Sequence, residues 1–332
     1  MRVLIIGGTQ FVGYLLAWRL LAAGHQVTLL NRGTTPDPFG ERIDRLTCDR
    51  TTEEFDKAVS DRTWDACVDF AGYYGKDAAG VVRALGGRLG HYVFISSGQV
   101  YLVREGASWP ARETDYDGPV MPCPDTPHDR KDWDYGVGKR AAEDVLVRAW
   151  QEQRFPSTRL RLPMVNGERD YYRRIESYLW RLLDGGPVLL PDGGTVLCRH
   201  VYGMEVARAI SEILGNERTF GEAYNICQDE QPTLAELITM LAKLIGATPE
   251  LAPISGEKLA AVGLRPIQIS PFSDTWMSRL DPSRAFSEFG FRHRPLAEYL
   301  PAVVAHFLAA PPPDRPANFV HRALELELAA SL

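Results

Sequence analysis

The segment Tyr135-Gly-Val-Gly-Lys139 places a phenol and an ammonium group four residues apart, the spacing of neighbours on one face of a helix. A tyrosine is a poor base at neutral pH unless its phenolate is stabilised, and a lysine one turn away would supply the charge that does so. The alternative is a packed tyrosine beside a lysine that reaches solvent. Ser96-Ser97 ends a predicted strand upstream and favours the catalytic interpretation, because parallel α/β sheets bind ligands at the carboxyl ends of their strands.

A glycine-rich segment follows the first apolar run of the chain and precedes the first stretch of helical periodicity. Glycine lets the backbone turn sharply and approach a ligand, while the amide groups and the positive end of the helix favour a pyrophosphate. Because the segment lies between a strand and a helix, it predicts a dinucleotide site rather than a purely structural turn. The residues that would line this site are Gly7, Thr9, Gln10, Phe11, Val12 and Gly13.

The end of the second predicted strand bears on which nucleotide is bound. NAD-binding proteins commonly place an acid there, which accepts a hydrogen bond from the ribose 2′-hydroxyl. This chain has Asn31-Arg32 instead, and a guanidinium group suits the 2′-phosphate of NADP. NADP is therefore favoured and NAD is the alternative, in which case Arg32 is an ordinary solvated cation. Asp49 is either a contact for the adenine edge or a plain turn residue.

The elements that must position these residues alternate between strand and helix. Largely apolar runs predict buried parallel strands at 3–6, 27–30, 66–70 and 91–97, and residues 159–162 are predicted to form the next strand after the helix that holds residues 136–152. This alternation predicts an α/β fold, a Rossmann-type doubly wound parallel sheet with a smaller, mainly helical C-terminal substrate lobe. We expect the dinucleotide-binding domain over residues 1–162, with a return at about 195–228, and the substrate lobe over 163–332.

Composition excludes several classes of function. Of the 332 residues, 45% are hydrophobic and 24% are charged, which suits a folded chain rather than a disordered or fibrous one. The net charge of −6 disfavours nucleic acid as a partner, because phosphates would be repelled. Five widely spaced cysteines indicate neither a disulfide framework nor a metal site, and no apolar run is long enough for a signal segment or a membrane span. We expect a cytoplasmic protein with a small-molecule substrate, no metal and no membrane association, for which a homodimer is permitted.

Further motifs occur in a fixed order along residues 1 to 300. They are Phe94-Ile-Ser-Ser-x-x-Val-Tyr101, Tyr135-x-x-x-Lys139, Arg161-Leu-Pro163, His200-Val-Tyr-x-x-Glu-Val-Ala207, Tyr224-Asn-Ile226 and Leu280-Asp-Pro-Ser-Arg-Ala285. With these motifs and the glycine turn, the chain resembles the extended short-chain dehydrogenases/reductases of the NAD(P)-dependent epimerase/dehydratase family. The resemblance implies that Tyr135 is the general acid/base, that Lys139 holds the nicotinamide ribose and that Ser97 orients the substrate oxygen. It also implies that Ala71, Gly72 and Pro163 lie against the cofactor.

Three departures from the family pattern narrow the expected chemistry. Gln10 stands where the family turn usually has glycine, so a larger side chain would crowd the pyrophosphate. Dehydrating members carry an Asp-Glu pair directly after the active hydroxyl residue, whereas this chain has Gly98-Gln99, which disfavours 4,6-dehydration. Met164 stands where sugar-nucleotide members often place an asparagine near the diphosphate.

The substrate therefore stays open at this point. Candidate substrate contacts are Gln99, Asn166 and Arg199, while Arg173, Arg174 and Arg181 are either further diphosphate ligands or solvated surface charges. The long segment 102–134 carries His128, either a second acid/base or an exposed loop residue. We expect an NAD(P)-dependent epimerase or reductase that transfers a hydride at a hydroxyl or keto carbon of a sugar or sugar nucleotide. The alternative is a non-catalytic NADP-binding protein with a regulatory or RNA-binding role.

Overall fold

The computed structural model describes all 332 residues, which divide into two compact units. Unit 1 comprises Met1–Pro163, Gly203–Cys227 and Ser278–Arg292. Unit 2 comprises Met164–Tyr202, Gln228–Met277 and His293–Leu332. The chain therefore leaves unit 1 after Pro163 and returns to it twice, and the sequence patterns did not indicate the second return.

Unit 1 is built around a seven-stranded sheet in which all neighbouring strands run parallel. The strand order is β10-β6-β5-β4-β1-β2-β3. The strands are β1 (Arg2–Ile6), β2 (Gln26–Asn31), β3 (Asp44–Thr47), β4 (Ala66–Asp69), β5 (Tyr92–Ser97), β6 (Ser157–Leu162) and β10 (Ala223–Asn225). Successive residues of β1 and β5 are buried, as expected for strands that are covered on both faces. The predicted doubly wound α/β fold is confirmed.

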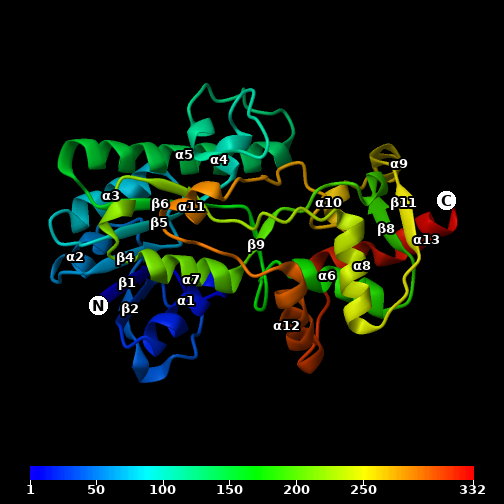
Figure 1. Cartoon of the computed structure of the whole chain (residues 1–332), viewed down its shortest axis with the longest axis horizontal. Coiled ribbons are helices and arrows are strands. Elements are labelled where there is room, and N and C mark those ends of the chain that lie inside the picture. The colour runs from blue at the N-terminus through cyan, green and yellow to red at the C-terminus, as the bar shows by residue number, and fades with distance from the viewer. The chain divides into compact units, whose positions relative to one another are not determined.

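Helices cover both faces of this sheet (Figure 1). On one face, Leu4 and Ile6 of β1 share a buried apolar cluster with residues of α2 (Glu54–Ser60), α3 (Gly75–Leu85) and α5 (Pro127–Gln153). On the other face, α1 (Phe11–Ala22) and α7 (Gly203–Ile213) lie side by side. Because alternate residues of a strand point to opposite faces, β1 contributes side chains to both layers.

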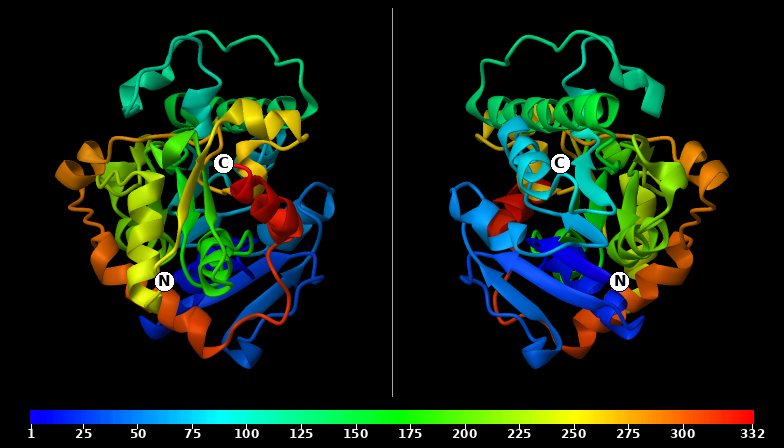
Figure 2. Two further views of the ribbon diagram at one scale, coloured as in Figure 1. Left: turned by 90° about the vertical axis from the view of Figure 1, so that its right-hand side faces the viewer. Right: turned by 90° about the vertical axis from the view of Figure 1, so that its left-hand side faces the viewer.

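The connection from β5 to α5 is long and contains the short helix α4 (Gln99–Leu102) and the 3₁₀ helix η2 (Glu113–Tyr116). Figures 1 and 2 show that it arches beside α5, on the side away from the sheet. It starts at the carboxyl end of β5, the edge at which parallel α/β sheets bind ligands. Unit 1 also contains η1 (Gly40–Arg42), η4 (Glu217–Thr219) and α11 (Ser283–Glu288).

Unit 2 is mainly helical. Its helices are α6 (Arg174–Leu183), α8 (Leu234–Ile245), α9 (Gly256–Ala261), α10 (Pro266–Ile269), α12 (Leu296–Ala309) and α13 (Arg322–Ala330), with η3 (Asp192–Gly194) and η5 (Ala317–His321). Two small parallel pairs are β7 (Met164–Asn166) with β9 (His200–Tyr202), and β8 (Val188–Pro191) with β11 (Leu251–Ile254). A buried apolar cluster joins α6, α8 and α12. In the whole chain, no helix has both the length and the apolar composition to cross a membrane.

Candidate active site

The long helix α5 carries both residues of the predicted tyrosine–lysine pair. Pro127, whose missing N–H suits the first helical position, begins the helix, and the Thr126 hydroxyl caps it by accepting a hydrogen bond from the Asp129 amide at 3.2 Å. Tyr135 and Lys139 follow one helical turn apart, and Nζ of Lys139 lies 5.7 Å from the centre of the Tyr135 ring. The structure therefore brings the phenol and the ammonium group together.

Two glycines between these residues let α5 lie close to its neighbours. A Cβ atom at Gly136 would lie 2.8 Å from the carbonyl oxygen of Gln99, at the start of α4. A Cβ atom at Gly138 would lie 2.7 Å from the carbonyl oxygen of Tyr73, just before α3. Side chains at either position would push the helix away from the strand ends, so the two glycines let α5 hold its reactive groups there.

Lys139 is held by two backbone carbonyl groups. The residue is 3% exposed, and its Nζ donates hydrogen bonds to the carbonyl oxygens of Gly72 and Ile95, both at 2.7 Å. Burial lowers the pKa of Lys139 to about 8, although nearby carboxylates, Asp69 foremost, favour the charged form. At neutral pH the group is therefore largely protonated, and its positive charge lies beside Tyr135.

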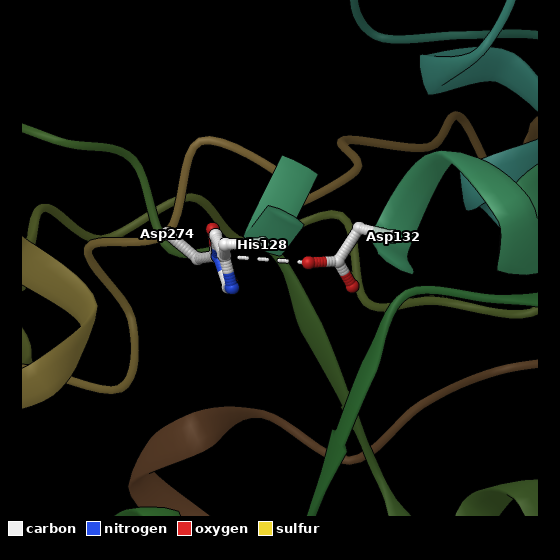
Figure 3. Close-up of side chains that lie close together, drawn as sticks. All are labelled: His128, Asp132 and Asp274. Atoms are coloured by element: carbon white, nitrogen blue, oxygen red, sulfur yellow. Dashed lines mark ion pairs between the residues drawn. The ribbon is translucent and has the colours of Figure 1, made fainter. Parts of the chain in front are cut away.

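Ser97 and Gln99 connect the end of β5 to the same helix. Oγ of Ser97 accepts a hydrogen bond from the backbone amide of Gln99 at 3.2 Å. The Gln99 side chain in turn donates from Nε2 to Oδ1 of Asp132 at 3.2 Å. Asp132 also pairs with His128, whose Nε2 lies 3.6 Å from Oδ2 (Figure 3). A polar chain thus runs from the predicted active serine to the N-terminal turns of α5.

Asp69 anchors the loop that carries Ala71 and Gly72. It is fully buried at the end of β4 and accepts hydrogen bonds from Arg50 (2.7 Å), the Tyr92 hydroxyl (2.7 Å) and the Ala71 amide (2.8 Å). The sequence pattern does not reveal this anchor, because Arg50 precedes Asp69 by 19 residues and nothing near either residue marks the two as partners. One feature of the sequence does indicate it: an acid stands at the end of a strand that is otherwise apolar and buried.

The predicted glycine turn joins β1 to α1 with little room for side chains. Gly7 and Gly8 have φ angles of 83° and 87°, the region that favours glycine. A Cβ atom at Gly8 would lie 2.5 Å from Cγ2 of Ile5, and one at Gly13 would lie 2.2 Å from Cα of Gly8. The bare backbone of this turn fits the close approach that a pyrophosphate group requires.

The backbone at Gln10 is extended, so this position of the turn accepts a residue larger than glycine. Gln10 is exposed, with φ −123° and ψ 155°, which any L-residue adopts, whereas Phe11 has a φ of 43°, uncommon for a bulky residue. Thr9 precedes Gln10, and α1 opens with Phe11, Val12 and Gly13. The first turn of α1 has no side-chain cap and no acidic residue, so its amide groups and its dipole remain for an anion.

The residues predicted to select the nucleotide lie at the ends of β2 and β3. Oδ1 of Asn31 accepts a hydrogen bond from the Gly33 amide at 2.8 Å, and Arg32 is exposed. Asp49 follows the neighbouring strand β3. Hydrogen bonds from Thr51 lower the pKa of Asp49, and the positive charge of Arg32 acts in the same direction. This edge therefore carries an exposed guanidinium group near a carboxylate.

The other predicted substrate contacts belong to unit 2. Asn166 is fully buried, and its amide nitrogen lies 2.5 Å from Nδ1 of His200. Arg199 is 4% exposed and donates to the carbonyl oxygen of Asp229 at 3.3 Å. Both side chains are engaged within their own unit, and their substrate roles stay predictions. Pro163, predicted to lie against the cofactor, is the last residue of the first segment of unit 1.

Two curated proteins are similar to this chain. One is the chloroplast stem-loop binding protein of 41 kDa b of Arabidopsis thaliana, 28% identical over 264 residues, which are 75% of this chain and 64% of that protein. The other is 2′-dehydrokanamycin reductase of Streptomyces kanamyceticus, 27% identical over 226 residues, which are 67% of this chain and 60% of that protein. The chain thus spans less than two thirds of the length of these curated relatives.

Solved structures share the fold over most of the chain. The UDP-glucose 4-epimerase of Thermus thermophilus, in complex with NAD, has a TM-score of 0.69 and 23% sequence identity, covering 93% of this chain and 100% of that one. Structures of dTDP-glucose 4,6-dehydratases also share the fold. At this level of identity, the likeness shows the architecture alone.

A family model matches residues 3–227, which include all of β1 but its first residue, the glycine turn, Ser97 and the Tyr135–Lys139 pair. The model describes the NAD dependent epimerase/dehydratase family. The match covers more than half of the chain, including the segments that form most of unit 1. The chain belongs to the NAD dependent epimerase/dehydratase family.

Proposed function

We propose that the chain is an NAD(P)-dependent epimerase or reductase that transfers a hydride at a hydroxyl or keto carbon of a sugar. One observation carries the proposal: Lys139 is buried between the carbonyl groups of Gly72 and Ile95 and lies beside Tyr135. Burying an ammonium group opposes folding unless it is compensated. A use for its charge in proton transfer explains why the charge is kept there.

The chain's own residues would handle the proton of the substrate. Nicotinamide, when bound, supplies or accepts a hydride at its C4 atom. The Tyr135 hydroxyl exchanges a proton with the substrate oxygen, and the charge of Lys139 stabilises the phenolate that results. Ser97, at the end of β5, would orient the same oxygen through its Oγ atom. If the cofactor stays bound the net reaction is epimerisation, and if it leaves the net reaction is oxidation or reduction.

The glycine turn would hold the pyrophosphate of the cofactor, and the carboxyl end of β2 would hold the ribose of its adenosine half. We propose NADP as the preferred nucleotide. The exposed guanidinium group of Arg32 can form a charge-assisted hydrogen bond with a 2′-phosphate, and the last residue of β2 is Asn31 rather than an acid that could accept from a 2′-hydroxyl. Asn31 is engaged with the Gly33 amide and keeps this short turn closed.

The same proposal excludes 4,6-dehydration by an acid pair. Gln99 cannot act as an acid or a base, and its amide is engaged with Asp132. An aspartate cannot simply replace Gly98, because its Cβ atom would lie 2.1 Å from Oγ of Ser278 in the same unit. These local contacts support the exclusion, although dehydratases share the fold.

A second candidate function is RNA binding without catalysis, which the similarity to the Arabidopsis stem-loop binding protein suggests. A stem-loop binding protein would use the fold as a scaffold, with no need for a reactive tyrosine. The net charge of −6 and the buried charge of Lys139 favour the enzyme instead.

A Tyr135→Phe variant separates the two functions. NADPH binding is followed by fluorescence, and oxidation of NADPH is followed with a panel of keto sugars. The variant should bind NADPH as the wild type does and lose turnover by about 10²- to 10⁴-fold, because the proton donor is gone. Tyr172→Phe, which removes an exposed hydroxyl in unit 2, is the control. Unchanged turnover in Tyr135→Phe, or salt-dependent binding of a stem-loop RNA with no turnover in the wild type, would contradict the enzyme.

A further inference from the structure

A buried carboxylate on α5 is bonded to the end of β5. Glu143 is fully buried and follows Lys139 by four residues, so the two side chains lie one helical turn apart. Its Oε1 atom accepts a hydrogen bond from Oγ of Ser96 at 2.5 Å, and Ser96 is 3% exposed. Ser96 directly precedes Ser97, which is predicted to orient the substrate oxygen. The helix is therefore fastened to the strand at the position next to the predicted active serine.

The same carboxylate contacts a second strand. Arg161 on β6 is the partner of Ser96 in the parallel pairing of β5 with β6. Its guanidinium group donates to Glu143 from Nη2 at 2.6 Å and from Nε at 3.1 Å. Although burial opposes ionisation, the charge of Arg161 holds the pKa of Glu143 below its ordinary value. The carboxylate is therefore ionised at neutral pH, and the hydrogen bond from Ser96 is charge-assisted.

Two more hydrogen bonds join α5 to the residues around Ser97. Nζ of Lys139 donates to the carbonyl oxygen of Ile95, two residues before this serine. Arg140 donates from Nη1 to the carbonyl oxygen of Val100, three residues after it, at 2.9 Å. Ser97 therefore lies between positions that are bonded to α5 on both sides.

The link between Ser96 and Glu143 differs from the other two because both of its partners are side chains. The other two end on backbone carbonyl groups, which any residue at those positions would offer. A buried ion pair such as that of Glu143 with Arg161 is often no more stabilising than apolar residues of similar volume. A role in fixing the helix against the strand accounts for a charged group at this place.

We propose that Ser96 and Glu143 are positioning residues, which hold α5 in register with β5. Through this register they keep Ser97 aligned with Tyr135 and Lys139. The assignment rests on the proposed hydride-transfer function and adds two residues to the same site. Both side chains are buried, so they act through the residues that they align rather than by contact with the substrate.

Ser96→Ala tests the proposal, because it removes the link and leaves the ion pair of Glu143 with Arg161 in place. The matched control is Ser157→Ala, at a serine of β6 that is 1% exposed. The Ser157 hydroxyl has no hydrogen-bond partner. The control therefore loses the same buried atom without losing a link between strand and helix.

The first measurement needs no substrate. Ultraviolet absorbance follows the ionisation of tyrosines as the pH is raised, and subtraction of the same protein with Tyr135→Phe isolates Tyr135. In Ser96→Ala, Tyr135 should ionise about 0.5 pH unit higher than in the wild type, because the ammonium group of Lys139 is no longer held as close to it. In Ser157→Ala it should ionise as in the wild type.

The second measurement is turnover with NADPH and the keto sugar that the wild type reduces fastest. Ser96→Ala should lower kcat roughly 10- to 100-fold, because small misplacements of reacting groups are costly. The KM for NADPH should change by less than about twofold, since the glycine turn is untouched. Ser96→Thr and Ser96→Val have the same shape and differ in the hydroxyl, so Ser96→Thr should retain about fivefold more turnover or better.

Three results would overturn the inference. They are an unchanged ionisation of Tyr135 in Ser96→Ala, equal kcat in Ser96→Ala and Ser157→Ala, and equal kcat in Ser96→Thr and Ser96→Val when both are folded. Each leaves the hydride-transfer proposal in place if Tyr135→Phe abolishes turnover. Wild-type turnover in Tyr135→Phe would instead refute the proposed function, and if no sugar is reduced, the titration of Tyr135 still decides the inference.

Discussion

Replacing Lys139 by methionine should change how the free energy of unfolding depends on pH. Burial lowers the pKa of Lys139 to about 8, from an ordinary value of 10.5. Below pH 8 the folded and the unfolded chains both bind the proton. Between pH 8 and 10.5 the folded chain has released the proton while the unfolded chain keeps it. The unfolded state then binds more protons, so the stability due to this group rises with pH in that window.

The size of the effect follows from the two pKa values. Each unit of difference corresponds to about 1.4 kcal/mol, so the wild type should gain about 3 kcal/mol relative to Lys139→Met between about pH 7.5 and 10.5. The variant also leaves the carbonyl groups of Gly72 and Ile95 without their donor, at a cost of about 1–3 kcal/mol each, but that cost does not depend on pH. The pH dependence of the difference in the free energy of unfolding therefore reports the titration of Lys139. The part of the difference that is constant with pH also contains the cost of the two unpaired carbonyl groups.

Urea unfolding followed by circular dichroism at a series of pH values measures the slope. Comparison with a variant cancels the titration of other groups that the two proteins share. Lys76→Met, at an exposed lysine on α3, is the matched control and should parallel the wild type. The reasoning fails if the wild type and Lys139→Met stay parallel to within about 1 kcal/mol across this range, because the lysine would then not titrate there.

The buried ion pair between Glu143 and Arg161 and the exposed cation Arg32 make two further predictions. Glu143→Gln should lower the free energy of unfolding by about 3–5 kcal/mol, because it leaves the guanidinium group of Arg161, 2% exposed, without its carboxylate. Denaturant titration measures this, with Glu222→Gln as a control at a partly exposed pair with an expected loss below about 1 kcal/mol; equal losses would contradict the interpretation. Arg32→Ala should weaken NADPH binding roughly tenfold or more and change NADH binding by less than about twofold in fluorescence titrations. An equal loss for both nucleotides would refute the NADP preference.

Hydrophobic periodicity predicted the strands and helices of unit 1, because a strand that is buried on both faces of a sheet is a continuous apolar run in the sequence. Val3-Leu-Ile-Ile6 and Tyr92-Val-Phe-Ile95 are apolar runs, and they lie in the inner strands β1 and β5. The glycine turn and the Tyr135–Lys139 spacing are equally local, so the relation of each to its strand or helix could be predicted. Local patterns do not predict that Ser278–Arg292 belongs to unit 1, because that depends on contacts with residues far away in the sequence.

The contacts that position the candidate site are mostly non-local and could not be read from pattern alone. Gln99 meets Asp132 across 33 residues, and Arg50 meets Asp69 across 19. Hydrophobic patterns report which side chains are buried but not which polar groups pair with one another. Asn166 is an example, since its position suggested a substrate contact and the structure places it in a buried hydrogen bond with His200.

Titration of NADPH and of NADH into the whole chain tests the central claim most directly. Calorimetry on freshly purified protein, with any retained nucleotide removed and identified by mass spectrometry, gives both affinities and the stoichiometry. An NAD(P)-dependent enzyme with an exposed Arg32 at the β2 end should bind one nicotinamide nucleotide per chain, and NADPH more tightly than NADH. Absence of saturable binding of either nucleotide would contradict the account.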